Sequence, residues 1–368
     1  MKAPGHLPQA PGQPPTAFTP AGAPPASFAM PGAQHPGFPP GGFAPYPGPY
    51  AAPARKRPVG LMVALAAAVV LLSGVLVLAL SQAIGQHPET TSAGYQNEDW
   101  SVPPVSSEPP QLPTPEDEAE AKKLTRQNRI YDVSLASPVR CDLQLPPGGE
   151  INDDKLQEHM EAYIGCLTRV WGPAIEAAGS TAYQPKITVY PAGEKVTTGC
   201  GSTDSGNAFY CPSDQQLYIA QDVLKALSDD ASQARIVFDL IIAHEFGHAV
   251  QGRTGILGGE RWLAESASSK QEKAELSRRS EVQADCFAGA ALNSLSSSLQ
   301  LTETDRSDIM RVMFEIGDDQ LAERHNVNPD RVDAHGSGQN RRMWAERGLK
   351  AKSVEDCNTF TAPSSEVE

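Results

Sequence analysis

The chain has 368 residues and a formal net charge of −14 at pH 7. Its length allows one large domain or two small ones. The excess of acid argues against a nucleic-acid-binding protein and against one that lies flat on an anionic bilayer, because both partners would be negatively charged. No repeat is visible along the chain, which argues against solenoid and propeller architectures.

The N-terminal segment is dominated by proline and glycine. Its first 54 residues hold 16 of the 33 prolines and a single charged residue, Lys2. Such a composition cannot bury enough apolar surface to offset the entropy lost on ordering. Residues 1–57 are therefore predicted to be a disordered tail.

An apolar run follows the tail. From Pro58 to Pro88 there is no Lys, Arg, Asp or Glu, and residues 59–80 are almost all apolar. About 22 residues can cross a hydrocarbon core of ~30 Å. A signal peptide is the alternative, but it would start near the N-terminus. Residues 58–82 are thus predicted to be one transmembrane helix. Three basic residues precede it, which predicts a single-pass protein of the cell membrane with a cytoplasmic N-terminus and an extracytoplasmic domain after the helix.

The remaining chain divides into a linker and a folded part. Residues 83–125, rich in proline and acid, are predicted to be an extended linker. Residues 126–368 have a size that suits one core. Apolar spacing predicts an α+β domain, mainly helical with a small sheet. Its helices are expected near 151–171, 232–251, 278–299, 304–314 and 339–347, the first ending at Gly172–Pro173, and its strands near 186–190 and 216–220.

All six cysteines lie in this outer part, and an even number beyond a membrane anchor favours three disulfides. Reduced, buried cysteines are the alternative. A zinc–thiolate site is disfavoured because no C-x-x-C pair is present. The turn-rich stretch between Cys200 and Cys211 makes them the easiest pair to close. Position along the chain suggests the other two pairs, Cys141–Cys166 and Cys286–Cys357.

The segment HEFGH at 244–248 carries the strongest chemical signal. His244 and His248 are four residues apart on a predicted helix, so both imidazoles lie on one face and can reach one Zn²⁺ ion. Glu245 would lie beside that ion and act as a general base toward a water molecule. The alternative is a surface helix with two solvated histidines. Ile236 and Leu240 precede the motif and argue that the helix is buried, where two unpaired histidines would be costly.

A catalytic zinc site needs a third protein ligand. The histidine extension HExxHxxGxxH fails, because Gln251 and Thr254 occupy its glycine and histidine positions. Glu281 is the expected ligand instead. Asp285 lies one helical turn later and is expected to orient a ligand histidine by a hydrogen bond. Two carboxylates on a wet helix face are the alternative; if Glu281 is not the ligand, Asp285 or His325 would have to serve.

A second histidine segment begins at His335. An imidazole or guanidinium near the metal could stabilise the developing oxyanion. His335 is the candidate catalytic group, with Arg341 as its helper. The alternative is a loop histidine and a surface arginine.

These segments carry a family likeness. The chain resembles the bacterial family of neutral zinc metallopeptidases, in a form found in actinobacteria. The resemblance implies a zincin fold with the gluzincin ligands His244, His248 and Glu281. Gluzincin membrane peptidases also carry a histidine followed six residues later by an arginine, as His335 and Arg341 do. The matching segments are CGSTDSGNAFYCPSDQQLYI at 200–219, AHEFGHAVQ at 243–251, EVQADCFAG at 281–289, HGSGQNRRMW at 335–344 and CNTF at 357–360.

The resemblance also implies how a substrate would bind. The FYCP segment, at 209–212, looks like the edge strand of a zincin, which holds an extended substrate by strand addition. The expected function is a membrane-anchored zinc-dependent endopeptidase that uses one Zn²⁺ ion on extracytoplasmic protein or peptide. A zinc amidase or other hydrolase of cell-envelope material is one alternative, and a non-catalytic zinc-stabilised binding module is another. A structural zinc is usually closed by four protein ligands, whereas three are counted here. The oligomeric state cannot be read from the sequence.

Overall fold

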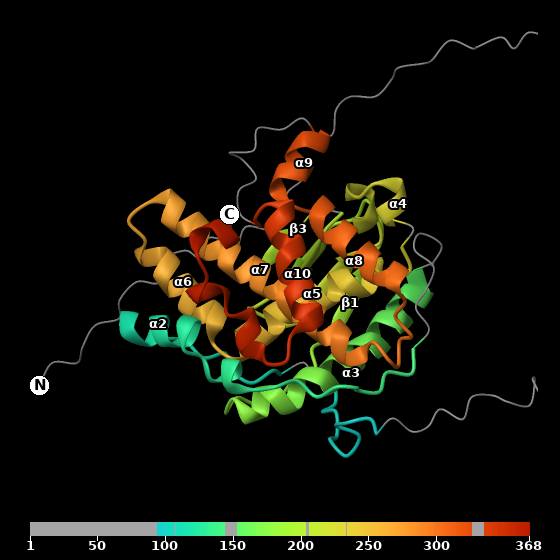
Figure 1. The fold of residues 1–368 in the computed structure, drawn as a ribbon, viewed down its shortest axis with the longest axis horizontal. Helices are drawn as coiled ribbons and strands as arrows, with labels where there is room; N and C mark the ends of the chain where they lie inside the picture. Colours follow the sequence, from blue (N-terminus) through green and yellow to red (C-terminus); the bar gives the residue numbers. More distant parts are fainter. Residues whose placement is uncertain (1–93, 107, 144–152, 204–205, 233, 326–334) are drawn as a thin grey trace, which may run out of the picture. The chain divides into compact units, whose positions relative to one another are not determined.

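Helices make up most of the fold, and two small sheets complete it (Figure 1). The computed structural model describes residues 94–106, 108–143, 153–203, 206–232, 234–325 and 335–368. The strands are β1 (Ile187–Tyr190), β2 (Val196–Thr198), β3 (Gly201–Thr203), β4 (Ala208–Cys211) and β5 (Gln216–Ala220). The α-helices are α2 (Glu118–Arg126), α3 (Asp153–Ala177), α4 (Asp229–Ser232), α5 (Val237–Arg253), α6 (Ile256–Ser266), α7 (Lys270–Leu295), α8 (Glu303–Glu315), α9 (Asp318–His325) and α10 (Gly338–Lys350). Single 3₁₀ turns are η1 (Arg129–Asp132), η2 (Val223–Ala226), η4 (Val354–Cys357), η5 (Thr359–Thr361) and η6 (Ser364–Glu366).

Helix α7 lies at the centre of the packing, with α5 on one side and α10 on another (Figure 1). Helix α5 is buried over almost its whole length, as expected for a helix that is apolar on most sides. Gly247 lets it approach α7 closely: a Cβ there would lie 3.0 Å from the Cα of Ala284. The two helices expected to carry the site are therefore packed directly against each other.

The larger sheet has the strand order β1-β5-β4. Strands β1 and β5 are parallel, and β4 is antiparallel to β5. Strand β4 is thus an edge of the sheet, and it lies against α5. Strands β2 and β3 form a separate antiparallel pair. The mixed fold, mainly helical with small sheets, confirms the expected class at this level.

Most of the predicted elements have counterparts in the structure. The helices expected near 151–171, 232–251, 278–299, 304–314 and 339–347 correspond to α3, α5, α7, α8 and α10, and the two strands to β1 and β5. Helix α7 starts earlier than expected because Ser269 caps it: its side chain accepts a hydrogen bond from the N–H of Glu272. Helices α2, α4, α6 and α9 were not predicted, and α9 is short and polar.

Helix α3 continues past Gly172–Pro173, where it was expected to end. Pro173 has no N–H, so the carbonyl of Arg169 loses its helical partner. The side-chain amide of Asn97 donates to that carbonyl at 3.1 Å instead. The ring of Trp100 packs directly on Gly172, where a Cβ would collide with it. Residues from the segment 94–125 thus stabilise a helix that its own sequence would break.

The same segment differs from the linker predicted at 83–125. From Gly94 onward it belongs to the folded unit, and it contains α2, which Asp117 caps. Its backbone carbonyls serve the domain: that of Pro110 accepts hydrogen bonds from Gln215 and from Arg253, at 2.8 and 2.7 Å. A proline-rich chain can therefore be ordered by polar contacts that its composition does not reveal.

The six cysteines form three disulfides with the predicted pairing, Cys141–Cys166, Cys200–Cys211 and Cys286–Cys357. The last joins α7 to η4. It begins one residue after Asp285, so it fixes the C-terminal segment beside the candidate site.

The tail predicted at 1–57 and the transmembrane helix predicted at 58–82 lie outside the described residues. Within the described ranges, no helix is both long and apolar enough to cross a bilayer. On this finding the predicted localisation, a single-pass membrane protein with an extracytoplasmic catalytic domain, is corrected. It had rested on the composition of one apolar run.

Candidate metal centre

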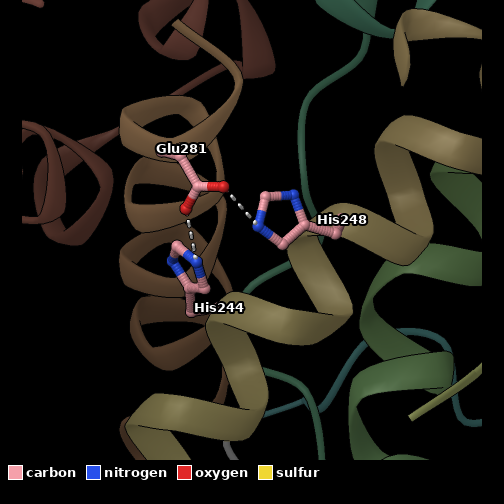
Figure 2. A group of neighbouring side chains, drawn as sticks. All are labelled: His244, His248 and Glu281. Atoms are coloured by element: carbon pink, nitrogen blue, oxygen red, sulfur yellow. Dashed lines mark ion pairs between the residues drawn. The ribbon is translucent and has the colours of Figure 1, made fainter. Parts of the chain in front are cut away.

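Three donor groups meet where α5 packs on α7 (Figure 2). The Nε2 atom of His244 is 3.3 Å from one oxygen of Glu281, and that of His248 is 3.6 Å from the other. One donor atom from each residue lies within 4.8 Å of the other two. Tetrahedral ligands at 2.0–2.1 Å from zinc are roughly 3.3 Å apart, so this spacing suits one ion with little movement.

The donor set matches the preference of zinc. Two imidazole nitrogens and one carboxylate oxygen are the ligands of many catalytic zinc sites, in which a fourth position stays open. In both histidines, Nδ1 lies against a side-chain oxygen, from Asp285 for His244 and from Gln251 for His248. Nε2 of each ring is thereby directed toward the cluster. The residues present therefore fit a zinc ion.

Asp285 lies against His244, one of the two histidines of the centre. Its Oδ1 accepts a hydrogen bond from Nδ1 of His244 at 2.7 Å, and the carboxylate is fully buried. Both of its oxygens are engaged, because Arg341 also donates to them, from Nε at 2.9 Å and from the terminal nitrogen at 2.8 Å. Asp285 is thus a support for His244 and is not placed as the third ligand.

Arg341 does not occupy the place that its expected catalytic role requires. Its side chain is 2% exposed, two of its nitrogens donate to Asp285, and the third donates to the carbonyl of Ile316. The guanidinium is thus engaged by Asp285 and by the carbonyl of Ile316. This placement differs from the one expected of a helper in oxyanion stabilisation, because all three nitrogens already donate to other groups.

Electrostatics in the centre favour a bound cation. Burial alone would lower the pKa of His244, yet Asp285 and Glu281 raise it to about 10. Burial alone would raise the pKa of Glu281, yet His248 and the other neighbouring imidazoles hold it well below its usual range. Without an ion, the negative carboxylates retain protons on the imidazoles. A divalent cation can take over that positive charge.

Glu245 faces the edge strand. Its Oε2 accepts a hydrogen bond from the backbone N–H of Tyr210 in β4, at 2.9 Å. Burial raises the pKa of Glu245, against the opposing effect of the two histidines. A carboxyl with a raised pKa, held beside the ligands, suits a group that takes up and releases a proton during a reaction.

His335 is held by Asp318, a residue that the sequence analysis did not single out. Asp318 accepts hydrogen bonds from the backbone N–H of His335 at 2.7 Å and from its Nδ1 at 3.2 Å. His335 also contributes to the lowered pKa of Glu281, so its ring lies within electrostatic reach of the centre. The two residues are 17 apart in the chain, and no local pattern links them. The side chain of His325 lies outside the described residues.

The fold and the donor set together define the class: a helical protein with an HExxH zinc-binding motif and a glutamate from the next packed helix. The chain belongs to the family described as "Putative neutral zinc metallopeptidase", whose sequence model matches residues 134–360. This match covers well over half of the chain and confirms the resemblance drawn from the sequence segments.

The chain is similar to proteins of Escherichia coli and of Mycobacterium. The protein YpfJ of Escherichia coli K12 is 34% identical over 216 residues, which cover 57% of this chain and 73% of that protein. Mb2605 of Mycobacterium bovis and Rv2575 of Mycobacterium tuberculosis are each 26% identical over 251 residues, which cover 62% of this chain and 82% of theirs. All three are described as uncharacterized. No solved structure matches the chain.

Proposed function

We propose that this protein is a zinc-dependent endopeptidase that binds one zinc ion through His244, His248 and Glu281. The observation that carries the proposal is the meeting of these three donors beside the buried carboxylate of Glu245. When bound there, zinc would supply a nucleophilic water at neutral pH and polarise the scissile carbonyl.

Glu245 would move the proton. Its Oε2 is occupied by the N–H of Tyr210, which fixes the carboxylate and leaves Oε1 to accept a proton from the attacking water. The same oxygen would then deliver the proton to the leaving amine, as general acid–base catalysis requires. Its raised pKa supports the second step, because a carboxyl whose pKa is raised by burial holds a proton more readily.

His335 would stabilise the oxyanion. Asp318 accepts from its Nδ1, which fixes the orientation of the imidazole ring. The loop that carries His335 is anchored as well, because Asp318 also accepts from the N–H of Gly336 at 3.1 Å. The imidazole would thus be positioned before the substrate binds.

Strand β4 would hold the substrate. Ala220 donates its N–H to the carbonyl of Asn207. In an antiparallel pair hydrogen-bonded and non-hydrogen-bonded positions alternate, so Ala208 and Tyr210 direct their backbone polar groups away from β5. The N–H of Tyr210 already donates to Glu245, so a substrate would pair with the backbone groups of Ala208 and with the carbonyl of Tyr210. An extended peptide can add to such an edge. Binding along the main chain suits cleavage within a polypeptide, which supports an endopeptidase.

The test compares the zinc-loaded full chain with its Glu245→Gln variant on an unfolded protein. Loss of the general base should lower the cleavage rate about 10²–10⁴-fold while zinc remains bound. Glu265→Gln, an exposed change on α6, is the matched control and should cleave as the wild type does. Equal cleavage by the Glu245 variant would refute the role given to Glu245. If the zinc-loaded wild type cleaved no protein or peptide, an amidase of envelope material would become the better reading.

A further inference from the structure

Gln251 lies one helical turn after His248 and is fully buried. Its Oε1 is 2.8 Å from Nδ1 of His248. Its Nε2 donates to the backbone carbonyl of Ser280 at 2.7 Å and to Oε1 of Gln283 at 3.1 Å. Every polar atom of this amide thus faces a partner, and one of those partners is a candidate metal ligand.

The direction of these hydrogen bonds fixes the tautomer of His248. A backbone carbonyl can only accept, so the nitrogen of the Gln251 amide must face Ser280. Its oxygen then faces His248, and that oxygen can only accept. Nδ1 of His248 must therefore carry the hydrogen. Nε2 keeps its lone pair for the metal centre, where it lies 3.6 Å from Glu281.

The chain of hydrogen bonds continues away from the centre. Nε2 of Gln283 donates to the carbonyl of Cys357 at 3.0 Å and to the hydroxyl of Tyr131 at 2.9 Å. That hydroxyl donates in turn to the carbonyl of Thr125 in α2, at 2.8 Å. The outer end of the chain therefore consists of carbonyls, which cannot donate. Because these backbone carbonyls can only accept, they determine which atom donates in each hydrogen bond between them and His248.

We propose that Gln251 is the positioning residue of His248, and that Gln283 and Tyr131 hold it in the one orientation that prepares His248 to bind zinc. The inference rests on the proposed zinc site and deepens it. The residue that excluded a histidine extension of the motif thus acquires a role of its own. A neutral amide raises the basicity of its histidine less than the carboxylate of Asp285 does, so the two ligands differ in donor strength.

The test measures zinc affinity and the absorption spectrum of the cobalt(II)-substituted full chain, neither of which depends on peptide cleavage. Gln251→Met keeps the side-chain volume but removes the acceptor, and should weaken zinc binding about 10–100-fold and alter the cobalt spectrum. Gln251→Glu keeps an oxygen that accepts from His248. Only its protonated form can also donate to the carbonyl of Ser280, so this variant should recover part of the lost affinity. Gln157→Met is the control, since Gln157 joins α3 to β1 by two hydrogen bonds far along the chain from the ligands.

Wild-type zinc affinity and an unchanged cobalt spectrum in Gln251→Met would overturn the proposal. Equal losses in the Met and Glu variants, both folded, would assign Gln251 to packing and would also overturn it. If Gln251→Met does not fold, Gln283→Met decides, because it leaves the contact with His248 in place; an unchanged spectrum there counts against the proposal. Failure of the wild type to bind zinc would instead remove the proposed function itself.

Discussion

The two histidines of the centre have opposite surroundings. His244 rests on a charged pair, in which Asp285 is held by Arg341 through two hydrogen bonds. His248 rests on two neutral amides, Gln251 and Gln283, whose hydrogen bonds end at backbone carbonyls. Both arrangements fix Nδ1 and direct Nε2 inward, but they do so with different physics.

The difference concerns what happens when one link is removed. A buried carboxylate that loses its cationic partner remains as an uncompensated charge, which is costly. A buried amide that loses a partner leaves an unsatisfied dipole, which costs about 1–3 kcal/mol. We therefore expect the His244 side to dominate stability and the His248 side to dominate the fine geometry of the ligands.

The largest effect is expected from Arg341→Met. It leaves Asp285 buried without its cation and should lower the free energy of unfolding by about 3–5 kcal/mol. Arg347→Met is the matched control, because its ion pair with Glu366 is partly exposed and should contribute within about 1 kcal/mol. Urea denaturation of the two variants provides the measurement. Similar losses in both would show that the charged pair has no special weight.

Removing the Cys286–Cys357 disulfide tests whether it supports the two amides, Gln251 and Gln283, on the His248 side. Replacing both cysteines by alanine should cost about 2–4 kcal/mol of stability. It should also weaken zinc binding, because the carbonyl of Cys357 is an acceptor of Gln283. The same replacement of Cys200 and Cys211 removes no acceptor of Gln251 or Gln283 and should leave zinc affinity unchanged. Zinc competition assays on both pairs would expose a failure of this distinction.

The smallest effect concerns Glu260, a carboxyl on α6. Burial and the nearby Glu281 raise its pKa from 4.5 to about 7. In metal-free protein the folded state then retains a proton that the unfolded state releases. The contribution of Glu260 to the free energy of unfolding should therefore fall as pH rises from about 4.5 to about 7, by on the order of 1–3 kcal/mol, and change no further above that range.

Glu260→Gln should remove that slope, and Glu265→Gln, exposed on the same helix, should keep it. Zinc should reduce the slope in the wild type, since a cation near Glu281 lowers the pKa of Glu260. Denaturation midpoints at pH 5 and pH 8, with and without zinc, would measure it. An unchanged slope in the Glu260 variant would assign the effect to another group.

Local spacing carried most of the sequence prediction. His244 and His248 are one turn apart on a helix, and so are Glu281 and Asp285; these relations need no knowledge of the fold. The packing of the two helices could be inferred only because both carry residues that can bind zinc. Gly247 supplies the physical reason for their close contact. With these two pairs of residues predicted, only the contact between α5 and α7 was needed to assemble the candidate centre.

The rest depended on long-range contacts. Arg341 reaches Asp285 across 56 residues, so its charge could be predicted to lie near the centre but not on which side of it. Asp318 and Gln283 had no local signal. Helix α3 passes Pro173 because Asn97, far along the chain, satisfies the freed carbonyl. In each case the residue that determines the structure is too distant in the sequence to form part of a local pattern.

Arg253, at the C-terminal end of α5, is a buried cation, and the acceptors of its guanidinium include the carbonyls of Pro110, Gln111 and Thr181. Two of these acceptors precede residue 134, where the family match begins. The unit recognised by sequence comparison is therefore shorter than the unit that folds. A recombinant fragment trimmed to the matched region would leave Arg253, at the end of the helix that carries both histidines, without two of its acceptors. A fragment for crystallisation should therefore begin no later than Gly94.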